Sequence, residues 1–327
     1  MSAHILQLFD AVTLVFAAVG LLRLRSVLRH TTLMKVWPWA WVAWTGAVVG
    51  WALRMAGSAA LVSYVDYFTA VAVLSPPLAS LGARRPTCRS WPLFVLLPMF
   101  AVLLWPAVSI GLATRFGKPL ELERPAIVMY CLVLLMGMGN YALGRCRYGV
   151  ILLSVFLALH VSGTTSMLKF FSPDQFRLYM EAIPTLLCFS LLGVVGTGGR
   201  SAPSPAMKSF RLYWPRSSSV DDATASEEDV NPFDAILFEF GELYGLVWSL
   251  RLQDRLNVFA EKQKWPGRFE GRRGIWTEPL TDAQRAEVER AFRWLFRRFV
   301  DPEWLDARLT PSGTPVAKEA FTSPIDS

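Results

Sequence analysis

The chain has 327 residues, of which 53% are hydrophobic and 18% are charged, and its mean hydropathy is +0.35. Soluble domains average about 25% charged residues, so this composition argues against an ordinary soluble enzyme. The net charge of +7 arises in residues 1–230, where 19 Lys and Arg stand against 11 Asp and Glu in short loops between apolar runs. Because there is no basic domain, the charge gives no support to a nucleic-acid partner.

The usual signatures of catalysis and metal binding are absent from the sequence. Its four cysteines lie far apart with no CxxC pair, which excludes a disulfide-dense scaffold and the common zinc modules. Three histidines leave little room for a histidine-ligated metal or haem, and there is no HExxH, GxSxG or phosphate-loop motif. We therefore predict no catalytic residue, no metal site and no cofactor, and we expect a non-enzymatic protein.

Seven apolar runs bounded by charged residues are long enough to cross a membrane as helices. They cover residues 5–22, 36–53, 59–82, 91–112, 125–144, 148–168 and 178–198. The sequence thus predicts an all-α, polytopic transmembrane helical bundle in residues 1–200. The second and third runs are separated by very little, and a re-entrant hairpin at that point would reduce the count to six.

Lys and Arg are concentrated in alternate loops between these runs. The loops 23–35, 84–89 and 145–147, together with residues 200–216, hold 13 basic residues, whereas the opposite set holds 6. Since basic loops remain on the cytoplasmic side, the N-terminus is expected outside and the C-terminus inside. The excess of Arg over Lys, 26 to 7, with abundant Ala, Val, Trp and Pro, indicates a GC-rich bacterial genome and hence a bacterial inner membrane.

Two finer features concern the second run. Trp37 and Trp51 fall near its predicted inner and outer boundaries, which fits interfacial aromatic belts. Gly46 and Gly50 form a GxxxG pattern, which is a candidate seam for close helix packing.

Residues 201–230 read as a juxtamembrane segment and flexible linker, followed by a small helical cytoplasmic domain at 231–309 and a disordered tail at 310–327. The pair Asn231-Pro232 begins a helix that continues to about Lys264. Its apolar face is expected to dock on the membrane domain or on a membrane-protein partner. The residues of this face are Phe233, Leu237, Phe240, Tyr244 and Trp248.

The rest of this domain contains a second helix and two short elements. A capping box at Thr281 and Gln284 begins the second helix. Residues 268–276 are expected to form a loop or a small hairpin, and residues 302–309 a short turn of helix.

Ionisable residues within the predicted spans all fall in the outer half of the membrane. Such groups are costly in hydrocarbon, so they normally face a bundle interior or a water-filled cavity. One hypothesis is an outward-open pocket that binds a small polar or cationic ligand or relays protons. Its candidate residues are Asp10, Arg54, Asp66, His160 and Glu181.

The alternative is that these charges form structural ion pairs near the interface. In that interpretation Asp66 pairs with Arg54, and Glu181 pairs with Lys169 or Arg177.

Two segments, Leu74-Ser-Pro-Pro-Leu-Ala-Ser-Leu-Gly-Ala-Arg-Arg-Pro86 and Tyr244-Gly-Leu-Val-Trp-Ser-Leu-Arg-Leu-Gln-Asp-Arg-Leu-Asn257, resemble parts of uncharacterised planctomycete-type multi-pass membrane proteins. The resemblance implies no activity and transfers no functional residue.

The lipid bilayer is the first expected partner. The function that we expect is a membrane subunit or accessory factor of a transport or biogenesis assembly. The alternatives are a small-solute or proton-coupled transporter that uses the outer polar residues, a seven-span membrane sensor and, last, an intramembrane enzyme.

Overall fold

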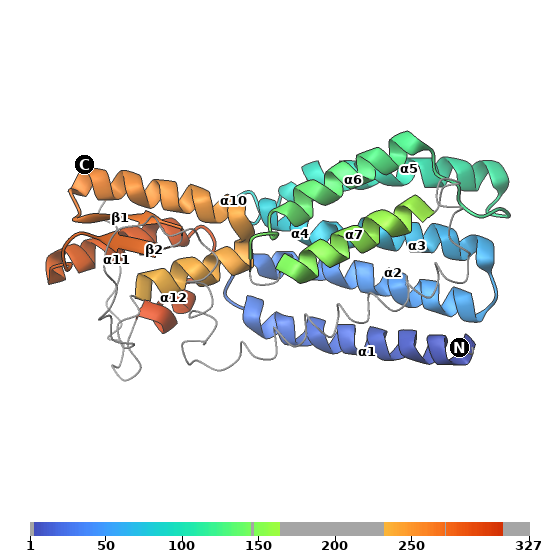
Figure 1. The fold of residues 1–327 in the computed structure, drawn as a ribbon, viewed down its shortest axis with the longest axis horizontal. Helices are drawn as coiled ribbons and strands as arrows, with labels where there is room; N and C mark the ends of the chain where they lie inside the picture. The colour runs from blue at the N-terminus through green and yellow to red at the C-terminus, as the bar shows by residue number, and fades with distance from the viewer. Residues whose placement is uncertain (1–2, 145–146, 164–231, 272, 310–327) are drawn as a thin grey trace.

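A computed structural model describes residues 3–144, 147–163, 232–271 and 273–309. The described chain is mostly helical and forms two parts that lie end to end along the long axis of the molecule (Figure 1). The first part is an elongated bundle of helices, and the second is a smaller body at one end of the bundle. We call the end of the bundle that meets the body the junction end, and the opposite end the far end.

The bundle contains every described helix up to residue 163. These are α1 (Ala3–Leu28), the 3₁₀ turn η1 (Thr32–Lys35), α2 (Trp37–Met55), α3 (Ala59–Val73), α4 (Ser75–Leu81), the π-helical turn η2 (Pro92–Leu96), α5 (Leu97–Thr114), α6 (Arg124–Gly139) and α7 (Arg147–Gly163). Successive long helices run in opposite directions (Figure 1). The first six predicted runs fall on these helices, although residues 164–168 and the whole seventh run, 178–198, lie outside the described residues.

Three helical stretches of the described chain are long and apolar enough to cross a membrane, namely Asp10–Leu28, Ala59–Leu81 and Pro92–Thr114. α6 and α7 are apolar but shorter. α2 has 19 residues, but five of them are tryptophan, whose indole N–H groups need hydrogen-bond acceptors and reduce the mean hydropathy of the helix. The three long apolar stretches indicate a membrane location.

Tryptophans of α2 join this helix to α1 in a repeating pattern. Three of the five donate the indole N–H to a backbone carbonyl of α1: Trp37 to Leu21 (2.8 Å), Trp44 to Leu14 (2.9 Å) and Trp51 to Gln7 (3.4 Å). The spacing of seven residues is two helical turns, so all three indoles face the same neighbour. We call this set the tryptophan ladder. It extends along the length of α2, so these indoles also join helices and do not only mark the membrane boundaries.

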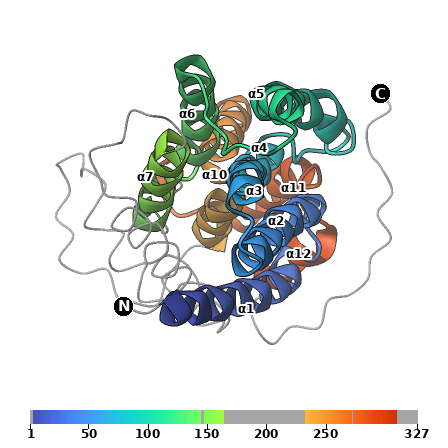
Figure 2. The ribbon, with the colours of Figure 1, turned by 90° about the vertical axis from the view of Figure 1, so that its right-hand side faces the viewer.

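The GxxxG pattern lies where α2 packs against α3. A methyl group on Gly46 would come within 2.6 Å of the Thr69 hydroxyl, and one on Gly50 within 2.9 Å of the Asp66 carboxylate. Only glycine therefore permits this close approach, and the predicted packing seam is confirmed within the chain. Figure 2 shows α3 at the centre of the bundle, where it contacts α2, α5 and α7, while α1 lies at the edge against α2.

The body begins with a long helix and continues with a hairpin and two further helices. Its elements are α10 (Pro232–Gln263), β1 (Gly267–Glu270), β2 (Arg273–Trp276), α11 (Asp282–Phe296) and α12 (Pro302–Leu309). The strands pair antiparallel, with Gly267 opposite Trp276, so the hairpin alternative is confirmed. The capping box is also confirmed, because Thr281 accepts from the Gln284 backbone and Gln284 accepts from the Thr281 backbone.

The expectation of one continuous helix from residue 231 to 264 is wrong at Gly245. This residue has φ +78° and ψ −174°, which divides α10 into two helical halves. The apolar spacing continues through the break, and for that reason periodicity alone did not reveal it.

An aromatic core connects the body to the bundle. Phe240 stacks on Tyr244 and meets Phe296 and Phe299 edge to face, with ring centroids 4.5–5.1 Å apart. The same buried cluster includes Leu28 and Leu33, which belong to the bundle. The expected linker at 201–230 and tail at 310–327 lie outside the described residues.

Candidate functional site

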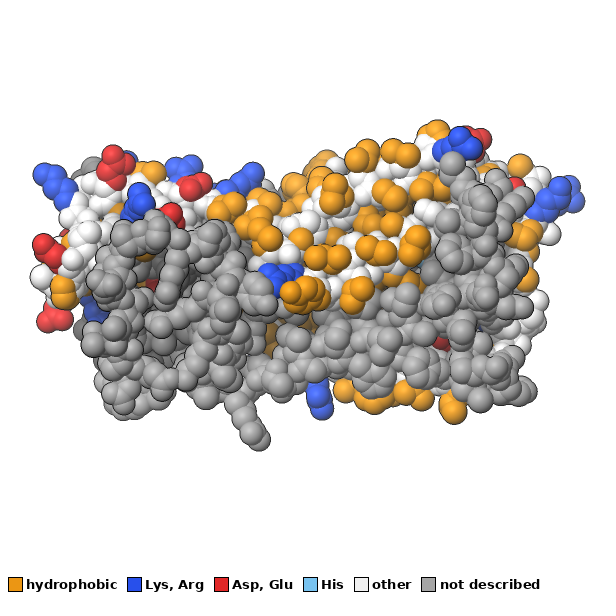
Figure 3. Space-filling model, in the orientation of Figure 1, with side chains coloured by type: hydrophobic (Ala, Val, Ile, Leu, Met, Phe, Trp, Pro, Cys, Tyr) orange, Lys and Arg blue, Asp and Glu red, His pale blue; other side chains and the backbone are white. Residues whose placement is uncertain are grey.

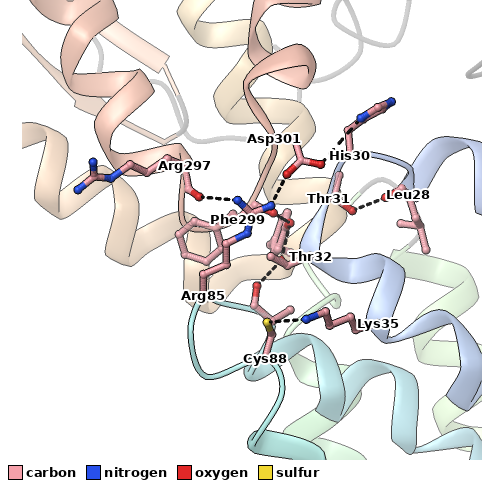
Figure 4. A network of polar contacts seen from close by, with 12 residues as sticks. Leu28, His30, Thr31, Thr32, Lys35, Arg85, Cys88, Arg297, Phe299 and Asp301 are labelled. Carbon is pink, nitrogen blue, oxygen red and sulfur yellow. Dashed lines mark hydrogen bonds and ion pairs between the residues drawn. The ribbon is translucent and has the colours of Figure 1, made fainter. Parts of the chain in front are cut away.

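The body docks on the loops at the junction end of the bundle, and backbone hydrogen bonds fix its position (Figure 4). Phe299 accepts from the Thr32 amide (2.7 Å), and Thr31 forms an isolated antiparallel bridge with Val300. In the second loop, the Arg85 amide donates to the Arg298 carbonyl (2.8 Å). Backbone bonds of this kind fix position and orientation together, because neither partner can rotate away as a side chain does.

Tyr244 is the central buried polar group of the junction. Its hydroxyl donates to the Phe299 carbonyl (2.7 Å) and lies 3.0 Å from the Thr32 hydroxyl. The Thr32 hydroxyl also contacts the Ala83 carbonyl, so the two loops and the body meet at this point. Burial raises the pKa of Tyr244 well above its ordinary value, which keeps the phenol neutral.

Asn140, just after α6, binds the break in α10. Its amide donates to the Tyr244 carbonyl (3.1 Å), and its side-chain oxygen accepts from the Val247 amide (2.9 Å). A methyl group on Gly245 would come within 2.2 Å of the Asn140 amide nitrogen. Gly245 and Asn140 therefore form one docking contact. The only sign of this contact in the sequence is Asn140 itself, a single amide side chain in an otherwise apolar run.

Charged groups line the exposed edge of the junction. Arg85 pairs with the Asp301 carboxylate, and His30 Nδ1 lies 3.8 Å from the other Asp301 oxygen. With Glu303, His30 and Asp301 offer three ligand atoms within 4.8 Å of one another. The Arg85 guanidinium occupies the same carboxylate, however, and its positive charge disfavours a cation there.

The structure places the predicted docking face in the interior. Phe233, Leu237, Phe240, Tyr244 and Trp248 are between 0 and 8% exposed, and they pack against α11 and the bundle loops. Of the two covers expected for this face, the described residues show docking on the bundle. About 80 residues bury too little surface alone, and the bundle loops supply the missing contacts.

The structure brings three of the five outer residues together at the far end. Arg54 Nη1 donates to both carboxylate oxygens of Asp66, each at 2.9 Å, and both side chains are partly buried. The Arg54 Nε is buried and has no hydrogen-bond partner in the described chain. His160 of α7 stacks on Phe156 and interacts electrostatically with Asp66 and Arg54.

The remaining two outer residues are Asp10 and Glu181. Asp10 lies on α1, three residues after Gln7, the last acceptor of the tryptophan ladder. Glu181 lies outside the described residues. The described structure therefore contains the ion pair Asp66–Arg54 of the structural interpretation. The pocket hypothesis is supported by His160 and by the Arg54 Nε, which has no hydrogen-bond partner among the described residues.

Comparison with known protein families, with curated proteins and with solved structures finds no match to this chain.

Proposed function

We propose that the chain is a multi-pass protein of the bacterial inner membrane, and that it serves as a non-enzymatic subunit or accessory factor of a transport or biogenesis assembly. The observation that carries this proposal is the junction. Its buried polar groups bind other groups of the same chain, so they serve architecture and not chemistry. In this role the bundle anchors the protein and the docked body is its fixed cytoplasmic extension.

The loops of the junction support the proposed orientation. The body contacts residues near 30, 85 and 140, which are the loops that the Lys and Arg bias assigns to the cytoplasm. The loops near 57 and 118 lie at the far end and belong to the opposite set.

The directions of the helices support an odd number of spans. α1 begins at the far end and α7 runs toward it, whereas α10 begins in the body and reaches the junction at its break (Figure 1). The last described residue before the gap therefore lies toward the far end, and the first one after the gap lies in the body. The apolar run 178–198 has the length for a seventh crossing.

Single cysteines on a cysteine-free background test the orientation. Exposed positions are available at both ends: Ala56→Cys and Glu121→Cys at the far end, and Thr87→Cys and Ala283→Cys at the junction end and in the body. A membrane-impermeant maleimide is expected to label the first two in intact cells and the last two only after lysis. Labelling of all four in intact cells, or of none, contradicts the proposed topology.

Purification from native membranes in a mild detergent tests the subunit role. We expect a partner of fixed stoichiometry, measured by native mass spectrometry of the tagged full chain. A partner-free particle would overturn the subunit role without affecting the topology.

A second candidate function, a small-solute or proton-coupled transporter, is favoured by one observation. Arg54 has an unpaired, buried Nε beside a carboxylate and a histidine in the outer half of the bundle. Asp66→Asn combined with His160→Ala tests it, with Ser109→Ala on the exposed surface of α5 as the control. Normal expression, assembly and cellular phenotype of the double variant would exclude this function.

A further inference from the structure

A group of exposed basic side chains lies at the junction end of the bundle, on α1 and on two loops. We call it the basic collar, and it consists of Arg23, Arg25, Arg29, Lys35 and Arg89. The two loops are neighbours in space, because Thr32 contacts the Ala83 carbonyl and Lys35 Nζ donates to Cys88 Sγ (3.6 Å; Figure 4). Lys35 and Arg89 therefore belong to one local surface.

Acidic residues are scarce in the sequence around the collar. Asp66 is the only acidic residue between Asp10 and Glu121, and it pairs with Arg54 at the far end. The body brings two carboxylates to this region: Asp301 pairs with Arg85, and Glu303 lies beside Asp301 and His30. Within the part of the chain that the structure describes, no member of the collar forms an ion pair, and the thiol of Cys88 is a weak acceptor for Lys35.

Large apolar side chains are exposed directly beside the collar. Phe94 is 73% exposed and Leu93 58%, one turn after Arg89, while Leu22 and Val27 are exposed among the arginines of α1. Figure 3 shows apolar side chains spread over the bundle and basic side chains at both of its ends. Exposed apolar surface bordered by unpaired cations is the pattern expected where hydrocarbon meets headgroups.

We propose that the basic collar binds the headgroups of anionic phospholipids in the cytoplasmic leaflet, with Lys35 and Arg89 as its centre. The proposal rests on the membrane location proposed above. A phosphodiester offers acceptor oxygens and a negative charge, and among the described residues no carboxylate pairs with these cations. The exposed leucine and phenylalanine side chains favour a lipid over an acidic protein, since a lipid supplies acyl chains for them as well.

The experiment compares three forms of the full chain in nanodiscs of phosphatidylcholine with and without phosphatidylglycerol. The forms are the wild type, the collar variant Arg29→Gln/Lys35→Gln/Arg89→Gln and the control Arg255→Gln/Arg285→Gln/Arg290→Gln. The control removes the same charge from exposed positions of the body that form no ion pair in the described chain. Native mass spectrometry measures the lipids retained, and thermal unfolding in phosphatidylcholine alone checks folding.

We expect the wild type and the control to retain phosphatidylglycerol preferentially. We expect this preference to be at least about fivefold smaller in the collar variant, because a single basic residue at an anionic surface already contributes about that factor. High salt should weaken the wild-type preference. No preference in the wild type, or an equal loss in the control, would overturn the proposal. The proposal would also be overturned if the wild type in detergent bound a polyglutamate peptide or inorganic phosphate as well as it binds phosphatidylglycerol, and if the collar variant lost that binding. Such a result would assign the collar to a soluble anion. None of these outcomes affects the cysteine-labelling result, so the two proposals fail separately.

Discussion

Gly245 lies in a backbone region that is essentially restricted to glycine, and its hydrogen faces Asn140. We predict that Gly245→Ala lowers the free energy of unfolding by about 3 kcal/mol, since backbone strain and the clash with Asn140 add together. Thermal unfolding of the detergent-solubilised protein measures the effect. Gly139→Ala is the control, because nothing lies within 4 Å of its added methyl group. Equal stability of the two variants would contradict the assigned backbone conformation.

Tyr244 makes the junction sensitive to alkaline pH. Its pKa is raised by burial, so the folded state favours the neutral phenol, and this stabilisation is complete below the ordinary value of 10. It is lost as the pH rises above 10 toward the raised value. We predict that Tyr244→Phe costs about 1–2 kcal/mol near neutral pH, through loss of the hydrogen bond to Phe299. Denaturation curves at several pH values should show a smaller alkaline loss in the variant than in the wild type.

Among the helices, the contact of α1 with α2 depends on the tryptophan ladder. Trp44→Phe keeps an aromatic ring but removes the indole N–H that binds Leu14. We predict a loss of about 1 kcal/mol, typical of one hydrogen bond between membrane helices. Trp105→Phe is the matched control, since Trp105 is 68% exposed on the bundle surface. An equal fall in melting temperature for both variants would show that ring size, not the N–H group, matters.

Elements of the fold were predictable to the extent that they are local. The capping box at Thr281 and the close packing at Gly46 depend on short spacings, and both are confirmed. The break at Gly245 was not predictable, because its cause is Asn140, a residue of the bundle. Trp37, Trp44 and Trp51 carry a visible spacing of seven, but only the position of α1 shows what they bind.

At the scale of the whole molecule, the body depends on the bundle. We predict that Asn140→Ala destabilises the protein by about 2–4 kcal/mol, because it leaves the Tyr244 carbonyl and the Val247 amide buried without partners. Limited trypsin digestion should then cleave within residues 232–309 while the bundle remains intact. Ser154→Ala is the control, since the Ser154 hydroxyl binds a carbonyl of its own helix. Unchanged protection of the body in Asn140→Ala would mean that it folds independently.

The candidate site could be predicted only in part from the sequence. Asp66 and Arg54 are close in sequence, at one end of adjacent spans, and their pairing was one of two open interpretations. The junction joins Thr31 to Val300 and Arg85 to Arg298, and no spacing rule relates residues so far apart along the chain. The apolar face of α10 was recognised, but two covers for it stayed open, because amphipathicity identifies a buried face without identifying what buries it.

The repeat of the tryptophan ladder has a consequence for biogenesis. Sliding α1 by seven residues in either direction re-forms two of the three bonds: Trp37 on Leu14 and Trp44 on Gln7 in one direction, or Trp44 on Leu21 and Trp51 on Leu14 in the other. The ladder alone therefore admits more than one alignment of these two helices. The turn between them is bound to the body through Thr31 and Val300, and this bond fits one alignment only. A segment synthesised later thus selects the final pairing of two helices synthesised before it. A nascent chain that stops before residue 232 should therefore hold this hairpin in a mixture of alignments.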